Sequence, residues 1–142
     1  MKYLLDTDHI SFLQRRSGLE FTRLTARMGQ HSSADFALSI VSFHEQVLGA
    51  HNFINRARTN ADMIRGYALL LEILQSFATA PIVPFDAGAI ALFDQLRSQR
   101  VRVSTMDLRI AAIAISRNLV LLTRNVSDFN KVPGLVMQDW TL

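Results

Sequence analysis

The chain has 142 residues, of which 49% are hydrophobic and 19% are charged, and its formal net charge is +3. This composition is typical of a globular domain with a hydrophobic core and excludes a disordered chain, and no apolar run reaches the roughly 18 residues that a membrane span needs. The absence of cysteine excludes disulfides and thiolate metal sites, and a cytoplasmic location is the expectation.

Short apolar runs alternate with longer segments of helical periodicity along the chain. Buried strands are predicted at residues 3–5, 36–41, 81–86, 119–123 and 134–137. Helices are predicted at residues 8–15, 19–28, 42–57, 62–77, 87–100 and 106–117. Strands that are apolar on both faces and alternate with helices predict an α/β fold, in which helices cover both sides of a parallel sheet. We expect one domain over residues 1–142.

The helix predicted at residues 62–77 has an apolar stripe at helical spacing. The stripe runs through Ile64, Ala68, Leu71 and Leu74. Core packing is the commoner fate of such a stripe, and an interface with another chain is the alternative.

Acidic residues stand where the predicted strands end. Asp6 follows the first strand directly, Glu45 lies in the first turn of the helix after the second strand, and Asp128 lies five residues beyond the fourth strand. Asp107 opens the helix that leads into the fourth strand. Functional groups of parallel α/β folds gather at the carboxyl ends of the strands. We therefore expect these four acids to converge there.

Each of these acids alone also fits a helix cap. Ser42 precedes Glu45 by three residues and Ser104 precedes Asp107 by three, as in a capping box, and Asn125 with Asp128 is a looser variant. We expect Asp8 to cap the helix that begins beside it. Capping and function are compatible, because a capped helix start presents a carboxylate rigidly.

Converging carboxylates raise one another's pKa or bind a cation. Oxygen ligands without cysteine suit Mg²⁺ or Mn²⁺. Such an ion activates water and stabilises charge on a phosphoryl group. Thirteen of the 15 basic residues are arginine, which suits phosphate and acidic protein partners or forms a solvated surface. An acidic metal centre in a basic chain suggests phosphodiester hydrolysis.

Four segments carry a more specific resemblance: "LLDTDHIS", "SIVSFHEQVLGA", "DLRIAAIAISRNLVLLTRNVSDFNKVPGL" and "QDW", spread in order over nearly the whole chain. With them the chain resembles the PIN-domain ribonucleases, in particular the VapC-type toxins of toxin–antitoxin pairs. The resemblance implies a five-stranded parallel sheet with helices on both sides and an endoribonuclease that uses Mg²⁺ or Mn²⁺. It also implies a cognate antitoxin and a homodimer.

The resemblance assigns roles to the four acids. The implied catalytic residues are Asp6, Glu45, Asp107 and Asp128. Asp6, Asp107 and Asp128 would hold the metal ion, directly or through water. Glu45 would complete the cluster and orient the attacking water.

Three further residues are candidates for binding the RNA substrate. Asn125 matches the polar residue usually found before the last acid of the family pattern. Arg109 and Arg124 lie near the acids, where they either hold phosphate or pair with the carboxylates. Two stretches depart from the family pattern: "QRVRVSTMD" before and including Asp107, and Ser42-Phe43-His44 before Glu45. We expect them to affect loop shape and RNA preference.

Two other functions compete with this interpretation. The segment "DTDHI" resembles the nucleophile loop of haloacid dehalogenase-like phosphatases, but Lys2 and Lys131 are the only lysines and no two acids are adjacent. The alternative from a different class is a PIN-like module that has lost catalysis and binds RNA or protein. Of the neighbouring polar residues, His9 is expected to pack in its helix rather than touch substrate, and Asp86 to cap the next helix.

Overall fold

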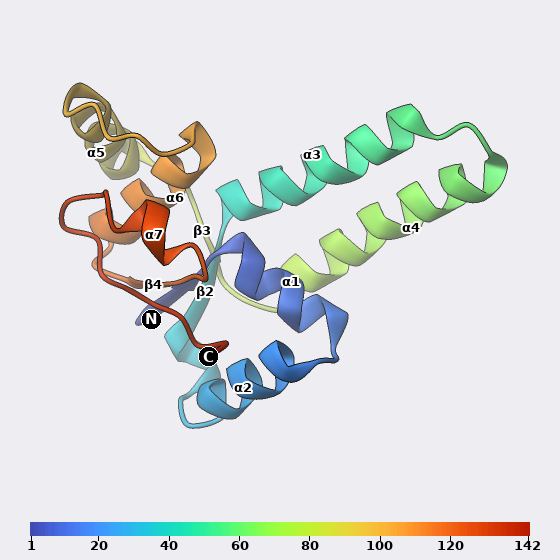
Figure 1. Cartoon of the computed structure of the whole chain (residues 1–142), viewed down its shortest axis with the longest axis horizontal. Coiled ribbons are helices and arrows are strands. Elements are labelled where there is room, and N and C mark those ends of the chain that lie inside the picture. Colours follow the sequence, from blue (N-terminus) through green and yellow to red (C-terminus); the bar gives the residue numbers. More distant parts are fainter.

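The computed structural model describes all 142 residues, which form one layered α/β unit with a projecting pair of helices (Figure 1). The strands are β1 (Tyr3–Leu5), β2 (Phe36–Ser39), β3 (Ile82–Val83), β4 (Val120–Leu122) and β5 (Met137–Gln138). The helices are α1 (Thr7–Arg15), α2 (Leu19–Met28), α3 (Ile40–Arg56), α4 (Asn60–Phe77), α5 (Ala87–Ser98), α6 (Thr105–Ser116) and α7 (Val126–Phe129), with the short 3₁₀ helix η1 (Ser33–Asp35).

The five strands form one parallel sheet in the order β3-β2-β1-β4-β5. The first strand of the sequence is therefore the central strand, and Tyr3 lies between Phe36 of β2 and Val120 of β4. The strand order changes direction between β1 and β4. Crevices that bind ligands form at the carboxyl ends of strands at such a switch point, so the sheet itself marks the residues that follow β1 and β4.

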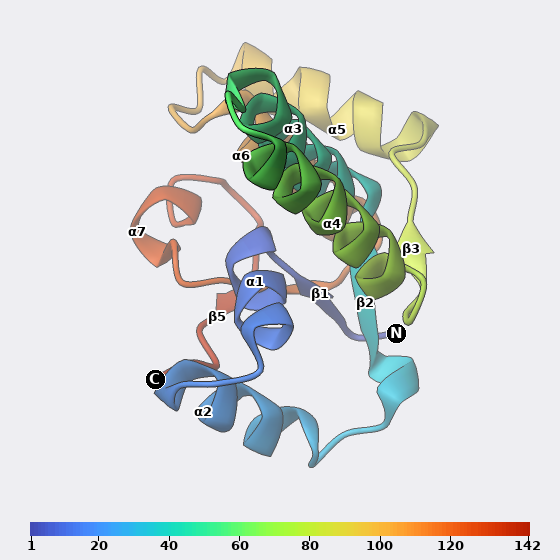
Figure 2. The same cartoon turned by 90° about the vertical axis from the view of Figure 1, so that its right-hand side faces the viewer.

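Both faces of the sheet are buried, as the apolar strands predict. In β1, Leu4 packs into one hydrophobic cluster and Leu5 into another on the opposite face. The first cluster contains residues of α5, α6 and α7, and the second contains residues of α1, α2, α3 and α4. Figure 2 shows α2 and α5 on opposite sides of the strands. The covering of a five-stranded parallel sheet on both sides is confirmed.

Helices α3 and α4 form an antiparallel hairpin that extends away from the sheet (Figure 1). At Gly66 of α4 a Cβ atom would lie 2.5 Å from Ile54 Cγ1 of α3, so the close approach of the two helices needs glycine there. Only Gly66, Ile73 and Phe77 of α4 are buried. Core packing of the stripe at 62–77 is therefore wrong: Leu71 and Leu74 remain 54% and 59% exposed.

The helices match the sequence pattern closely, whereas the strands differ more: β3 is shorter than the predicted 81–86, β5 shares only Met137 with the predicted 134–137, and β2 ends early. The apolar run at 36–41 continues from strand into helix, because the Ser39 hydroxyl accepts the Ser42 N–H and caps α3. Ser42 is therefore inside the helix and is not its cap. The short elements η1 and α7 were not anticipated by the periodicity. None of the helices combines the length and apolar character that crossing a membrane requires.

Candidate active site

Asp6 lies at the switch point of the sheet, where β1 ends beside β4. Its backbone N–H donates to the Leu122 carbonyl over 2.9 Å and extends the pairing of the two strands. Its carboxylate accepts the Thr7 N–H over 2.8 Å and the Thr123 hydroxyl over 2.7 Å. Asp6 is thus the N-cap of α1. The expectation that Asp8 is the cap is wrong, because the chain enters the helix one residue after the strand ends.

The environment of Asp6 disfavours its ionised form. The side chain is only 5% exposed. Burial, followed by the charge of Asp8 and more weakly that of Asp107, raises the pKa of Asp6 to about 7, although the hydrogen bonds from Thr123 and Thr7 oppose the shift. A carboxylate with such a pKa at a sheet edge is a candidate functional group.

Glu45 reaches this edge from α3. Because α3 begins at Ile40, Glu45 is in the second turn of the helix, not the first. Its Oε1 accepts the Thr7 hydroxyl over 2.8 Å, and the same hydroxyl lies 3.0 Å from Ser42 Oγ. Partial burial, together with the charges of Asp107 and Asp8, raises the pKa of Glu45.

Asp107 and Asp128 complete the acidic cluster from α6 and α7. The Ser104 hydroxyl accepts the Asp107 N–H over 3.1 Å, so the predicted cap holds the start of α6. Asn125 Nδ2 donates to Asp107 over 3.5 Å and to Asp128 over 3.2 Å, and so bridges the two carboxylates. Burial, Asp128 and Asp8 raise the pKa of Asp107, whereas hydrogen bonds from Asn125 and Lys131 lower the pKa of Asp128.

The four acids therefore meet at one edge of the sheet, as predicted, although they come from four separate elements. No three Asp, Glu or His side chains surround one point closely enough to hold a metal ion in this arrangement. Each carboxylate is instead turned toward a hydrogen-bond donor of the chain. The set of donor groups, all carboxylates with the Asn125 amide beside them, is nevertheless of the kind that Mg²⁺ and Mn²⁺ prefer.

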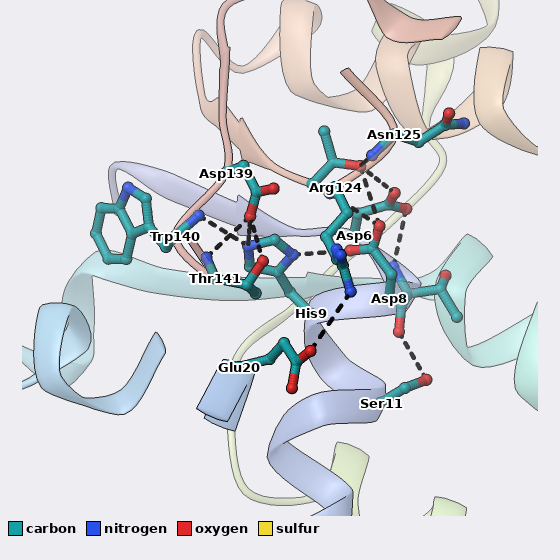
Figure 3. A network of polar contacts seen from close by, with 12 residues as sticks. Asp6, Asp8, His9, Ser11, Glu20, Arg124, Asn125, Asp139, Trp140 and Thr141 are labelled. Atoms are coloured by element: carbon teal, nitrogen blue, oxygen red, sulfur yellow. Dashed lines mark hydrogen bonds and ion pairs between the residues drawn. The ribbon is translucent and has the colours of Figure 1, made fainter. Parts of the chain in front are cut away.

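Asp8 lies beside Asp6 and belongs to a network of polar contacts that reaches Trp140 near the end of the chain (Figure 3). One of its oxygens accepts the Arg124 N–H over 2.9 Å, and the other lies 2.7 Å from His9 Nδ1. His9 Nε2 accepts the Trp140 N–H over 3.2 Å, so Nδ1 carries the proton and donates to Asp8. His9 is fully buried, which confirms that it packs. This network was not foreseen, because its partners are separated by more than a hundred residues.

Of the two alternatives for the candidate arginines, pairing with the site carboxylates is not what the structure shows, and phosphate binding stays a prediction. The Arg109 guanidinium stacks over the Phe93 ring at 5.8 Å and forms no ion pair with the acids. The Arg124 guanidinium lies over the Phe12 ring and 3.9 Å from Glu20, while its backbone N–H contacts Asp8 (Figure 3). Asp86 caps α5 as expected. Neither arginine neutralises the catalytic candidates directly.

An open parallel sheet with a cluster of acids at its switch point, of which Asp6 is buried, defines the class of α/β proteins to which the chain belongs. No family model matches the chain. It is, however, 30% identical to ribonuclease VapC1 of Haemophilus influenzae, with 99% of each chain covered. It is also 26% identical to the tRNA(fMet)-specific endonuclease VapC of Salmonella typhimurium, over 99% of this chain and 98% of the relative.

Solved structures show the same fold. The chain matches VapBC-1 from nontypeable Haemophilus influenzae with a TM-score of 0.76 and 23% identity, over the full length of both chains. It matches DNA-bound VapBC from Salmonella typhimurium with a TM-score of 0.73 and 24% identity, over 99% and 98% of the two chains. The chain belongs to the VapC family of PIN-domain ribonucleases.

Proposed function

We propose that this protein is the toxin of a toxin–antitoxin pair and hydrolyses RNA phosphodiester bonds with the help of Mg²⁺ or Mn²⁺. The observation that carries the proposal is the meeting of four acids at the switch point, of which Asp6, Glu45 and Asp107 have raised pKa values. Carboxylates crowded in this way are poised to bind a cation. The names of the VapC relatives, which are ribonucleases, support the same activity.

Asp6, Asp107 and Asp128 would hold the metal ion, directly or through water. A bound ion of this type supplies Lewis-acid stabilisation of the phosphoryl oxygens and lowers the pKa of water. The fit rests on the all-oxygen donor set and on the burial of Asp6, whose carboxylate is ionised more readily beside a cation. Asn125 would keep Asp107 and Asp128 oriented, since its amide already contacts both.

Glu45 would accept a proton from the attacking water. Thr7 holds Oε1, so Oε2 is left without a partner on the chain and can receive the proton. The raised pKa of Glu45 suits that role, because a general base works best when its pKa is near the working pH.

The test is RNA cleavage by purified protein with added Mg²⁺ and by the variants Asp6→Asn and Asp107→Asn. We expect cleavage by the wild-type chain, inhibition by EDTA, and a loss of at least about a hundredfold in each variant. If the wild-type protein binds RNA without cleaving it, the chain is a binding module. If the variants cleave RNA as well as the wild type does, Asp6 and Asp107 do not form the metal site.

The partner is a cognate antitoxin, and the hairpin of α3 and α4 is the surface that we assign to it. A groove of about 390 Å³ there is lined entirely by apolar side chains: Phe43, Val47, Tyr67, Leu70, Leu71 and Leu74. An apolar surface of this kind marks an interaction site. The structural neighbours are VapBC structures, which supports an antitoxin as the partner, and the apolar lining of the groove suits an apolar segment of it. A homodimer and a cytoplasmic location are further expectations, and a strict monomer in size-exclusion chromatography would contradict the dimer.

A further inference from the structure

A second concave surface lies beside the acidic cluster and carries the opposite charge. It is a depression of about 420 Å³, lined by Gln99, Arg100, Val101, Arg102, Lys131 and Pro133. Residues 99–102 connect α5 to α6, and Lys131 and Pro133 follow α7. We call this surface the basic pocket. Three of its six lining residues are cations and none is acidic.

The basic pocket adjoins the acids through both of its walls. Lys131 Nζ lies 3.3 Å from Asp128 Oδ1, so one wall contacts the cluster itself. The other wall runs from Arg102 directly into the start of α6, which carries Asp107. The two cations of that wall, Arg100 and Arg102, are exposed and form no ion pair within the chain. Their charge is therefore free for a ligand.

An acidic cluster by itself repels a polyanion, so a nuclease needs positive charge next to the reacting phosphate. Arginine matches phosphate with its planar pair of donors. Arg100 also has φ of 57°, a left-handed conformation that favours glycine and carries a conformational penalty for arginine. Its segment is one of the two that depart from the family pattern.

We propose that the basic pocket binds the phosphodiester backbone of single-stranded RNA next to the cleaved bond. The proposal rests on the proposed function, because it takes the reacting phosphate to lie at the four acids. Arg100 and Arg102 contact flanking phosphates, and Lys131 joins the pocket to Asp128. The contacts are to the backbone, so they set where the strand lies and leave the reaction itself to the acids.

The test compares the double variant Arg100→Gln/Arg102→Gln with the control Arg56→Gln/Arg58→Gln. The control removes the same charge from exposed arginines at the far end of the α3–α4 hairpin. Binding of a short fluorescent RNA is measured by anisotropy in EDTA, which prevents cleavage, between about 50 and 200 mM KCl. We expect the pocket variant to bind roughly tenfold more weakly at low salt, with a slope of log K against log salt smaller by about 1.4, since each single-strand phosphate contact contributes about 0.7.

Cleavage with Mg²⁺ gives the second readout. The pocket variant raises KM and leaves kcat close to the wild-type value, because it loses binding that is the same in the ground state and transition state. Equal losses of RNA affinity in the pocket variant and the control variant would show an effect of net charge and would overturn the proposal. If the wild-type chain cleaves RNA and the pocket variant binds and cleaves RNA as well as the wild type does, the proposed role of the basic pocket is wrong but the proposed function stands. A wild-type chain that neither binds nor cleaves RNA overturns the pocket and the proposed function together.

Discussion

The Thr7 hydroxyl donates to Glu45 Oε1 over 2.8 Å and joins the first turn of α1 to α3 across 38 residues of sequence. Because Thr7 directly follows Asp6, this bond fixes the distance between the carboxylate after β1 and the glutamate of α3. It also lowers the pKa of Glu45 against the larger effect of burial. The hydroxyl therefore controls both the position and the ionisation of the proposed general base.

Replacing Thr7 with valine keeps the shape of the side chain and removes this hydrogen bond. We expect the pKa of Glu45 to rise further, the acid limb of the pH–rate profile to move to higher pH, and kcat to fall roughly tenfold. Thr22→Val, which changes an exposed threonine of α2, is the matched control. A Thr7→Val enzyme with the wild-type acid limb would show that Glu45 is not the base.

Asn125 bridges Asp107 and Asp128. Replacing it therefore tests how much the orientation of these two carboxylates matters while both remain in place. We expect Asn125→Ala to need a higher Mg²⁺ concentration for half-maximal activity and to lose about 10- to 100-fold in kcat/KM, as is typical for groups that orient metal ligands. The pKa of Asp128 should rise, because the hydrogen bond from Asn125 is the largest cause of its depression. A Mg²⁺ titration measures the effect, with the exposed Asn130→Ala as control. If Asn125→Ala needs the same Mg²⁺ concentration as the wild type for half-maximal activity, Asn125 does not orient the metal ligands.

The raised pKa of Asp6 makes stability depend on pH. Between the ordinary value of 3.8 and about 7, the folded chain holds a proton that the unfolded chain has released. Stability without metal therefore falls as the pH rises through this window, by up to about 4 kcal/mol from Asp6 alone. Thermal melting in EDTA should show this decline in the wild type and a weaker one in Asp6→Asn. A difference between the two proteins that does not vary with pH would contradict the shift.

Added metal should act in the opposite direction. Protons and the cation compete for the same carboxylates, so Mg²⁺ or Mn²⁺ should raise the Tm more at about pH 8 than at about pH 5. The same titration on Asp107→Asn is the control for binding elsewhere on the chain.

His9 is a buried link between Asp8 and the backbone of Trp140. His9→Phe fills a similar volume but leaves the buried Trp140 N–H without its acceptor and removes one of the donors to Asp8. We expect a loss of about 1–3 kcal/mol in the free energy of unfolding, because one buried polar group becomes unsatisfied. His9→Gln, which retains a donor and an acceptor, should lose less. Urea denaturation measures both, and equal stability of His9→Phe and the wild type would rule out the structural role of the link.

The α3–α4 groove gives a prediction about partner binding. Leu71→Glu and Leu74→Glu change exposed side chains, so the fold should lose less than about 0.5 kcal/mol. We expect both variants to lose inhibition by the antitoxin and to keep full nuclease activity. Gln75→Glu, which adds the same charge to an exposed polar position of α4, should remain inhibited. Inhibition of all three variants alike would place the antitoxin elsewhere.

The parallel sheet and the acids at its edge could be predicted from the sequence because both depend on local patterns. Apolar runs specify strands that are buried on two faces, and the residues that follow parallel strands share an edge by geometry. Asp6, Glu45, Asp107 and Asp128 could therefore be placed together before their distances were known. Their catalytic roles remain predictions.

Other features depend on contacts that no local pattern records. The stripe through Leu71 and Leu74 has the periodicity of a core helix, and only the projection of the hairpin shows that it faces outward. The role of Asp8 was misjudged because Arg124, whose N–H it accepts, becomes its neighbour only when β4 joins β1. The basic pocket likewise needs two loops that lie about thirty residues apart in the sequence.

The sheet topology also determines when the acidic cluster can form during synthesis of the chain. The α3–α4 hairpin is translated well before α6, β4 and α7, whereas a single domain generally folds as one unit. Asp107 and Asp128 are thus among the last parts to emerge, and β1 cannot pair with β4 until then. The acidic cluster therefore cannot assemble until almost the whole chain has been made, and a chain truncated before α7 lacks Asp128 even if its other elements are complete.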